Sequence, residues 1–336
     1  MRVRENISKK RWREFVYNHP HGNIFQTPEM AEVYKRTKNY EPISLAVIDD
    51  TDNIIALLQA VVIREKGILG PLSSRSIIQG GPLFVEGEEG IKALKMLMEY
   101  YDRIIRKKAI YTEIRNMWDT SHILNTLSNF GYTYRDHLNF LVDLTKSKEE
   151  LWNNLSKSRR RFIRRARERG VIVEEITGRD LIPIFYELLK HTYRNAKIPL
   201  ADISLFNSAF DILAPKNLLK LFMARYKDEY IGGIMCLIYK GTIIEWFVTG
   251  SRRHSKLYPS DIVTWYPIEW GSENGFHTFD FLGAGDPKKK YGVREFKKQF
   301  GGTMVNFGRY RKIHATLKFW LAERGFKIYR KIRWGK

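Results

Sequence analysis

Two segments in different halves of the chain carry the same pattern of apolar residues. Residues 45–48 and 54–63 are mainly apolar and flank a polar turn, and residues 221–224 and 230–238 repeat this arrangement. Each pair predicts a β-hairpin, because short apolar runs around a polar turn are typical of paired strands. Corresponding residues of the two hairpins are separated by the same number of positions in both strands and across the turn. This favours a duplicated α/β unit, with chance similarity between two hairpins as the alternative.

The length of the chain agrees with two such units. A chain of 336 residues is long enough for two domains that each have a core of their own. Each half also has a helical pattern that leads into a Gly–aromatic turn and then an aromatic strand, at Gly131-Tyr132 and at Gly275-Phe276. Strands and helices in this mixed order predict two α/β domains with mixed sheets.

A boundary between the two domains is predicted just after the first aromatic strand. Ser147, followed three residues later by Glu150, matches the capping box that begins a helix. We therefore expect a hinge near Thr145, which divides the chain into a first domain over residues 1–145 and a second over 146–310.

The charge of the chain limits its partners. It contains 58 Lys and Arg residues against 37 Asp and Glu, a formal net charge of +21. Such an excess favours a polyanion, which leaves nucleic acid, an acidic membrane surface and phosphorylated substrates open. The single cysteine, Cys236, excludes an intrachain disulfide and a cysteine zinc site, and no metal is expected. We predict a cytoplasmic location, since neither a signal peptide nor a membrane-spanning run is evident.

Residues 279–302 contain the most informative local pattern. An apolar strand end leads into Gly283 and Gly285, where another group can approach the backbone closely. Asp286-Pro287 then breaks the strand, a lysine-rich loop follows, and residues 293–300 have helical spacing. Such a turn beside a short cationic helix suits an anionic group. An ordinary strand, turn and helix with a solvated basic face is the alternative.

This segment resembles the C-terminal signature of the FemAB/FemX family of non-ribosomal peptidyl transferases. Two further stretches agree with that family in the expected order: residues 23–29 resemble its opening helix cap, and residues 151–171 its basic helix. The resemblance implies two tandem GNAT-like domains with a cleft between them. It also implies transfer of an aminoacyl group from aminoacyl-tRNA to a cell-wall precursor.

The resemblance further implies roles for individual residues of this segment. Lys297 matches the lysine of the family's Phe-Lys pair and is our first choice to stabilise the developing oxyanion. Tyr291 is a candidate hydrogen-bond donor, and Asp286 either forms an Asx turn or accepts the proton of the attacking amine. The substrate and phosphate contacts that we expect beside them come from Arg294, Phe296, Gly283 and Gly285.

The first domain both follows and departs from the family pattern. Gly80 and Gly81 resemble its Gly-Gly-Pro turn and are expected to face substrate, with a plain tight turn as the alternative. Arg115-Asn116 stand where some relatives have an acidic residue followed by proline. This difference argues against a catalytic carboxylate at that position.

The loop over residues 250–260 bears on the acyl donor. GNAT enzymes that use acyl-CoA have a glycine-rich loop here, whose N–H groups bind the pyrophosphate. This chain has Arg252 and Arg253, but Tyr258 adds bulk and Pro259 lacks an N–H. We therefore expect no cofactor, with aminoacyl-tRNA as the donor and acyl-CoA as the less favoured choice.

Residues 156–169 contain eight Lys and Arg residues against Glu168 alone. We expect Leu151, Leu155, Phe162 and Ala166 to form the buried side of this helical region. Arg160, Arg161 and Arg164 on the other side are predicted to bind phosphates of tRNA or of a lipid-linked precursor. A solvated structural helix is the alternative.

The C-terminal segment, residues 309–336, mixes basic and aromatic residues with a single acid, Glu323. This composition suits a helix at an anionic membrane surface. The other interpretation is a terminal helix, over residues 311–336, that packs back on the first domain. The two interpretations are compatible.

Together these patterns predict an acyltransferase of FemAB/FemX type that modifies an amine of a cell-envelope precursor in the cytoplasm, with peripheral membrane contact through residues 309–336 left open. Two alternatives stay open: a CoA-dependent N-acyltransferase that acts on a surface glycan, and a basic nucleic-acid-binding protein with an inactive GNAT scaffold. A protein that only binds nucleic acid would have no need for small residues at the strand end over residues 283–285.

Overall fold

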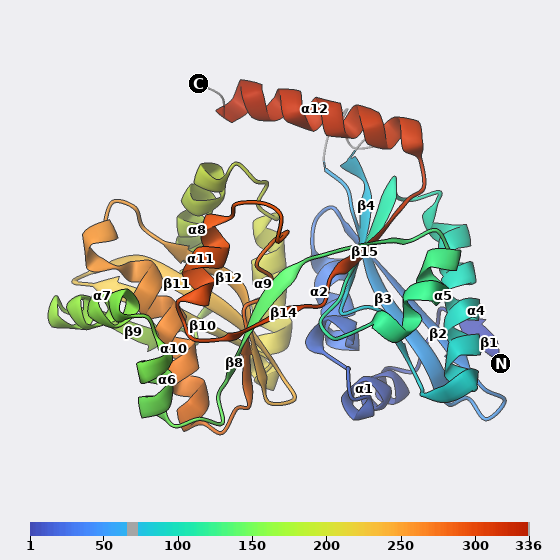
Figure 1. Cartoon of the computed structure of the whole chain (residues 1–336), viewed down its shortest axis with the longest axis horizontal. Coiled ribbons are helices and arrows are strands. Elements are labelled where there is room, and N and C mark those ends of the chain that lie inside the picture. Colours follow the sequence, from blue (N-terminus) through green and yellow to red (C-terminus); the bar gives the residue numbers. More distant parts are fainter. Residues whose placement is uncertain (66–72, 335–336) are drawn as a thin grey trace. The chain divides into compact units, whose positions relative to one another are not determined.

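The structure is a computed structural model that describes residues 1–65 and 73–334, with side chains up to Gly325. It is an α/β protein whose chain forms two compact units (Figure 1). Unit 1 comprises Met1–Asp136 together with Phe307–Lys336, and unit 2 comprises His137–Asn306.

The sheet of unit 1 is mixed, with the strand order β1-β2-β3-β4-β6-β15-β7 and β5 paired to β3. Neighbouring strands are antiparallel except β4 and β6, which are parallel because a helical crossover joins them. The strands are β1 Arg2–Arg4, β2 Tyr40–Ile48, β3 Ile54–Ile63, β4 Arg75–Gln79, β5 Leu83–Phe84, β6 Tyr111–Arg115, β7 Thr133–Arg135 and β15 Arg309–Ile313.

Helices cover both faces of this sheet (Figure 1). Helix α4 forms because its apolar residues recur every three to four positions; Leu94, Leu97 and Tyr101 are fully buried against one face. Helix α2 begins at Pro28, with Thr27 as its N-cap, and packs on the other face. The helices of unit 1 are α1 Lys9–Asn18, η1 Ile24–Gln26, α2 Pro28–Arg36, α4 Gly87–Ile105, η2 Ser121–Ile123, α5 Leu124–Asn129 and α12 Thr316–Trp334.

The sheet of unit 2 has the order β14-β8-β13-β12-β11-β10-β9. Only β12 and β13 are parallel, again across a helical crossover, which is α10. The strands are β8 Leu138–Asp143, β9 Val171–Glu175, β10 Leu219–Tyr226, β11 Glu229–Tyr239, β12 Thr242–Gly250, β13 Thr278–Asp280 and β14 Thr303–Asn306. The helices are α6 Lys148–Asn154, α7 Lys157–Glu168, η3 Arg179–Leu181, α8 Ile182–Ala196, α9 Ile203–Leu213, η4 Ala214–Lys216, η5 Ser255–Leu257, α10 Pro259–Glu273 and α11 Gly292–Lys298.

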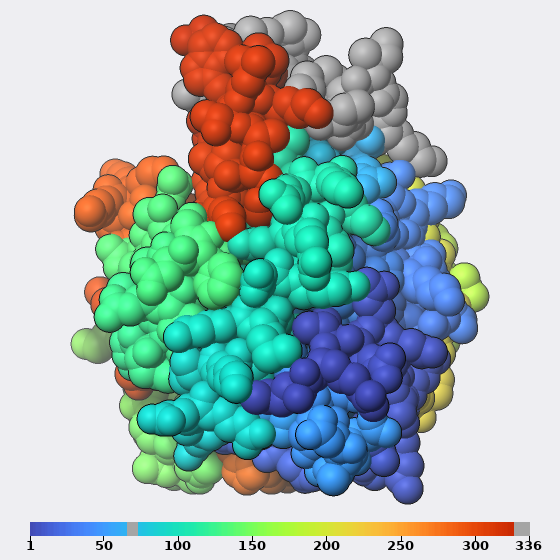
Figure 2. Space-filling view, turned by 90° about the vertical axis from the view of Figure 1, so that its right-hand side faces the viewer, coloured from blue at the N-terminus to red at the C-terminus, as the bar shows by residue number. Residues whose placement is uncertain are grey.

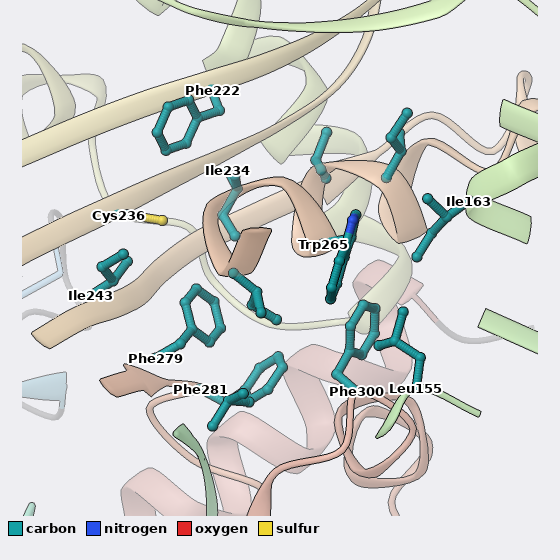
Figure 3. Packing of buried hydrophobic residues seen from close by; sticks show 14 of the residues in the cluster. Leu155, Ile163, Phe222, Ile234, Cys236, Ile243, Trp265, Phe279, Phe281 and Phe300 are labelled. Atoms are coloured by element: carbon teal, nitrogen blue, oxygen red, sulfur yellow. The ribbon is translucent and has the colours of Figure 1, made fainter. Parts of the chain in front are cut away.

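The core of unit 2 lies between α10 and the sheet (Figure 3). Trp265 of α10 is fully buried, and Phe279 and Phe281 make an edge-to-face contact at 4.9 Å between ring centroids. Cys236 is fully buried in the same cluster, and burial raises the pKa of its thiol well above the ordinary value. It is therefore a core thiol and not a nucleophile, as its apolar surroundings in the sequence predict.

The two sheets have the same topology. In each, four antiparallel strands lead through a helix to a parallel strand, β6 in unit 1 and β13 in unit 2. The predicted hairpins are β2–β3 and β10–β11, and both have a register shift near the turn. A strand from a distant part of the chain completes each sheet: β15 lies between β6 and β7, and β8 lies between β13 and β14. This shared order supports the duplication.

Several local expectations differ from the structure. Residues 138–143, placed before the boundary by sequence, form β8, which pairs with β13 and β14 of unit 2. Strand pairing of this kind leaves no local signal in the sequence. The buried residues of α7 are Ile163 and Ala166, which confirms the expectation for Ala166, whereas Phe162 is half-exposed and stacks on Tyr258 with 4.5 Å between centroids. The capping box of Ser147 and Glu150 is present at the start of α6.

Helix α12 follows β15 and begins against unit 1. The Phe319 ring meets the Tyr111 ring edge-on, with 5.5 Å between centroids. Leu317, Trp320 and Leu321 remain exposed on a helix that projects from the surface in Figure 2. The predicted roles of residues 326–336 lie outside the side chains that the structure describes.

Candidate active site

The strand end predicted to be functional is a buried, hydrogen-bonded turn of unit 2. Asp280, the last residue of β13, accepts hydrogen bonds from Asn139 Nδ2 and from the Leu282 amide, both at 2.6 Å. The Asn139 side-chain oxygen in turn accepts the Gly283 amide at 2.8 Å. Leu282 has φ of 57° and Gly283 has φ of 127°, so side-chain and main-chain bonds together hold an unusual backbone shape.

Lys297 of α11 supports this turn from the core side. Its ammonium group donates to the carbonyl oxygens of Phe281 at 2.5 Å and Gly283 at 3.0 Å, and pairs with Glu245 Oε1 at 3.0 Å. A lysine has three N–H donors, so these partners use all of them. Only 8% of the residue is exposed, whereas the sequence led us to expect it in a cleft. In this structure Lys297 holds the turn, and its role at a substrate oxyanion stays a prediction.

Glu245 is the partner that sequence analysis did not single out. It lies in β12, with 5% of its surface exposed, and its Oε2 has no hydrogen-bond partner among the described residues. Burial raises the pKa of Glu245, and the nearby Lys297 only partly opposes this effect. Burial likewise raises the pKa of Asp280. The signal that would have indicated a buried polar pair is a charged residue inside the apolar run of β12.

The loop between the turn and α11 places the other predicted residues. Asp286 accepts the Lys288 amide at 2.9 Å, which is the Asx turn that we expected as one of its roles. Arg294 donates to the carbonyl oxygens of Asp286, at 2.8 Å, and of Lys289. Its guanidinium group therefore braces the loop and is not a free phosphate clamp.

Tyr291 is the most accessible of the residues predicted around the turn. Its side chain lies against Gly285, so closely that a Cβ on Gly285 would come within 2.8 Å of the ring. Tyr291 is 41% exposed, and its hydroxyl has no partner in the described part of the chain. A free phenol beside a small-residue turn is able to donate a hydrogen bond to a bound group.

Phe296 links α11 to α7. The Arg159 guanidinium lies 4.9 Å from the centroid of the Phe296 ring and donates to Gln299 at 3.0 Å. Arg159 also pairs with Asp261 of α10. Phe296 thus packs between α11 and α7, and its contact with substrate stays a prediction.

The loop between β12 and α10 is the segment that the sequence led us to compare with the pyrophosphate-binding loop of enzymes that use acyl-CoA. Tyr258 has φ of 54°, and α10 begins at Pro259. Asp261, in the first turn of α10, is 7% exposed and its carboxylate is held by Arg159. Arg252 and Arg253 are exposed on this loop. A buried carboxylate and a missing N–H donor make this helix start a poor site for a diphosphate.

The basic helix α7 exposes most of its predicted phosphate-binding residues. Arg161 and Arg164 are exposed, and Arg160 is half-buried and donates to Asn153 at 3.3 Å. Arg161 lies over the Phe162 ring, Arg164 over the Trp152 ring and Arg169 over the Tyr258 ring, at 5.1, 5.6 and 5.8 Å. Arginines alternate with aromatic faces along this surface.

The Gly80–Gly81 turn of unit 1 is bonded to Trp118, a residue that lines a cavity. Both glycines have positive φ, 86° and 78°, as a tight turn of this kind requires. Trp118 donates to the Gly80 carbonyl at 3.1 Å and stacks on His21 with 3.9 Å between centroids. Trp118 and His21 line a cavity of about 1180 Å³ together with side chains that include Phe15, Phe84 and His122.

A second charged cluster lies in unit 1, on β6 and β15. Glu113 is 6% exposed and receives three guanidinium groups: Arg115 at 2.8 Å, Arg309 at 3.1 Å and Arg311 at 2.8 Å. Burial alone would raise the pKa of Glu113, but the arginines outweigh it and hold the pKa at about 2. Glu113 is therefore a permanent anion and a poor general base.

Comparison with known proteins gives these sites a context. Residues 153–298 match the family model of the acetyltransferase (GNAT) domain. The solved structure of FemX is similar over 96% of this chain and 99% of that chain, with a TM-score of 0.72 and 18% identity. The chain therefore has the fold of FemX, and its second unit contains the part that matches the GNAT domain model. The predicted resemblance and fold class are thus confirmed.

Other solved structures share the same fold at lower similarity. L-PGS from Bacillus licheniformis is similar over 96% of this chain and 98% of its own, with a TM-score of 0.59 and 12% identity. A tandem GNAT protein from the clavulanic acid biosynthesis pathway also has a TM-score of 0.59, with 8% identity, over 93% of this chain and 98% of that one. No curated protein matches the sequence significantly. The fold and the family model together support an acyltransferase.

The described residues contain neither a cluster of metal ligands nor a helix that could span a membrane. No three His, Cys, Asp or Glu side chains among them are grouped in a way that would hold a metal ion. In the same part of the chain, every helix is too short or too polar to cross a bilayer.

Proposed function

We propose that this tandem GNAT protein transfers an aminoacyl group from aminoacyl-tRNA to an amine of a phosphorylated or lipid-linked cell-envelope precursor. The fold is shared with FemX and with L-PGS, and the chain covers nearly the full length of both. This common architecture supports a donor and an acceptor of that class.

The observation that carries the proposal is the loop between β12 and α10. An acyl-CoA donor needs free N–H groups and positive potential at the start of α10. Here Pro259 lacks an N–H, and the Asp261 carboxylate lies buried in the first turn of the helix, paired with Arg159. The helix start therefore has one N–H donor fewer for a diphosphate, and its nearest guanidinium group, that of Arg159, is already paired, which argues for a donor without a CoA pyrophosphate.

The arginine surface of α7 supports a polyanionic donor. Arg161, Arg164 and Arg165 are exposed, and the loop with Arg252 and Arg253 is exposed as well. Nucleic acids combine phosphate charge with flat bases, and arginines interleaved with aromatic rings bind both features. The Phe162–Tyr258 stack, with a guanidinium on each ring, provides such an arrangement.

The reaction requires few groups from the protein. The amine nitrogen attacks the ester carbonyl carbon, a C–N bond forms, and the C–O bond to the ribose breaks. The proton that the amine loses ends on the ribose oxygen. We assign Tyr291 as the hydrogen-bond donor at the turn, and Lys297 as the residue that positions Gly283–Gly285.

The donor is tested by two measurements on the full chain. We expect single-turnover transfer from labelled aminoacyl-tRNA and no heat of binding with CoA in calorimetry. Stoichiometric micromolar binding of CoA, with transfer from acetyl-CoA, would favour the alternative of a CoA-dependent N-acyltransferase on a surface glycan. The description of the matching family model as an acetyltransferase domain is the observation that favours that alternative.

Two partner surfaces are tested by substitution. Replacing Arg160, Arg161, Arg164 and Arg165 with Gln is expected to flatten the salt dependence of tRNA binding, because fewer counterions are released. An unchanged slope would make α7 a solvated structural helix.

For the proposed cytoplasmic, membrane-associated location, Leu317 and Trp320 on α12 are the exposed apolar contacts to replace in a vesicle-binding assay.

A further inference from the structure

The arginine cluster of unit 1 has more positive charge than its structural role requires. Three guanidinium groups, from Arg115, Arg309 and Arg311, share the single carboxylate of Glu113. Among the described residues, no other carboxylate lies within ion-pair distance of the three. Two of the three positive charges are therefore not balanced by the protein.

The cluster lies on one face of the sheet, away from α4. Thr112 bonds to the hydroxyl of Tyr101 on α4, so residues 111, 113 and 115 of β6 point to the opposite face. On the neighbouring strand, Tyr310 is buried in the core beside α4, and Arg309 and Arg311 point away from it. The pairing of β15 with β6 thus brings all three arginines together.

The surroundings make this excess charge unfavourable unless an anion is present. Burial and the neighbouring Arg115 lower the pKa of Arg309 to about 10. The Nε of Arg311 is buried and has no acceptor among the described residues. A buried donor without a partner is destabilising, and like charges at this distance repel each other.

The site is nevertheless accessible. The side chains of Arg115, Arg309 and Arg311 are 36%, 24% and 24% exposed. Arg311 lies over the Tyr111 ring at 5.3 Å, which fixes its plane. Guanidinium groups held in fixed orientations are the donors that bind phosphate oxygens in pairs.

We propose that Arg115, Arg309 and Arg311 form an anion-binding site in unit 1 for the phosphate or diphosphate group of a substrate. Glu113 orients the three guanidinium groups, and their outer N–H groups bind the ligand. This inference deepens the proposed function by assigning the phosphorylated part of the acceptor to unit 1. The test of this inference measures binding alone. The inference can therefore fail while aminoacyl transfer is confirmed, and it can be confirmed while aminoacyl transfer fails.

The test uses two soluble probes in calorimetry with the full-length chain. Inorganic pyrophosphate represents a diphosphate-linked precursor, and glycerol 3-phosphate represents a phospholipid headgroup. We expect at least one of them to bind, and the preferred probe identifies the source of the phosphate. Binding of neither probe at low ionic strength would overturn the proposal.

Substitutions locate the site. Arg115→Gln removes the most exposed guanidinium and is expected to weaken binding at least tenfold, whereas Arg103→Gln on the exposed side of α4 leaves it unchanged. The proposal is contradicted if wild type and Arg115→Gln bind the probe equally well while an Arg164→Gln/Arg165→Gln variant loses affinity for it, because the probe then binds to α7.

A third variant separates ligand binding from structural pairing. Glu113→Gln removes the only carboxylate, so the cluster gains net positive charge. An anion site then binds the preferred probe at least as tightly as wild type, and the probe raises the Tm of the variant by more than that of wild type. A cluster that serves only to hold β15 on β6 would show no such shift in Tm.

Discussion

The same strand of the duplicated fold carries a buried acid in both units, in opposite electrostatic surroundings. Glu113 is the third residue of β6, and Asp280 is the third residue of β13. Three arginines hold the pKa of Glu113 at about 2, whereas burial raises the pKa of Asp280. In the described part of the chain, the hydrogen bonds to Asp280 come from the amide of Asn139 and from a backbone N–H.

The difference follows from the strand that completes each sheet. In unit 1 this strand is β15, which contributes Arg309 and Arg311; in unit 2 it is β8, which contributes Asn139. A charged strand creates a cationic surface around a fixed anion. A strand that places a neutral amide beside the acid leaves it free to form hydrogen bonds that hold the following turn. One topology thus supports a binding role in unit 1 and a turn-forming role in unit 2.

The largest effect is expected from breaking the buried pair of unit 2. Lys297→Met leaves Glu245 buried without a partner, and removing one member of a buried ion pair costs about 3–5 kcal/mol. The adjacent exposed residue gives a matched control, because Lys298→Met is expected to change the free energy of unfolding by about 0.5 kcal/mol or less. Denaturant unfolding measures both.

A second variant shows whether the loss comes from Glu245. Adding Glu245→Gln to Lys297→Met removes the unpaired charge, so we expect part of the stability to return. If Lys297→Met is as stable as Lys298→Met, the lysine does not hold the turn, and an oxyanion role becomes the better account of it.

An intermediate effect is expected in unit 1. Lowering the pKa of Glu113 from 4.5 to about 2 corresponds to about 3 kcal/mol of stability at neutral pH. Because the pKa is lower in the folded state, this contribution is present above pH 4.5 and is lost as the pH falls towards 2. The stability of wild type relative to Glu113→Gln is therefore expected to fall with acid, as unfolding curves between pH 7 and pH 3 would show.

The smallest effect is expected for Asp280→Asn. An amide oxygen still accepts the hydrogen bonds of Asn139 and Leu282, so the change in unfolding free energy is expected to be below about 1 kcal/mol. The folded-state pKa of Asp280 is raised, so its ionisation opposes folding, and the stability of wild type relative to the variant falls as the pH rises above 3.8. If the stability of wild type relative to Asp280→Asn instead rises with pH, as we expect relative to Glu113→Gln, the two acids are not in opposite surroundings.

Much of the fold was readable in the sequence because its signals are local. The repeated hairpins, the capping box at Ser147 and the turn at Gly283 all depend on neighbouring residues. The pairings of β8 and β15 depend on residues far along the chain, so the sequence placed the domain boundary after β8. The same reason hid the cluster around Glu113, whose arginines come from residue 115 and from β15.

The residue roles were harder to predict than the fold. The sequence indicated Lys297, Arg294 and Phe296 by resemblance, but a pattern does not show whether a side chain points into a core. Lys297 meets Glu245, and Arg294 meets backbone carbonyls. Tyr291 alone of the three predicted catalytic residues is left with an accessible, unpartnered polar group in the described structure.

The direct test of the central claim, that the two equivalent acids have opposite electrostatic surroundings, is a titration of their carboxyl carbons by NMR. Spectra from pH 7 to pH 4, assigned with the Glu113→Gln and Asp280→Asn variants, report both groups in the folded protein. We predict that the Glu113 resonance does not move over this range, while the Asp280 resonance titrates above the ordinary value of 3.8. A Glu113 resonance that titrates near 4.5 would contradict this account, as would an Asp280 carboxyl group that is still fully ionised at pH 4.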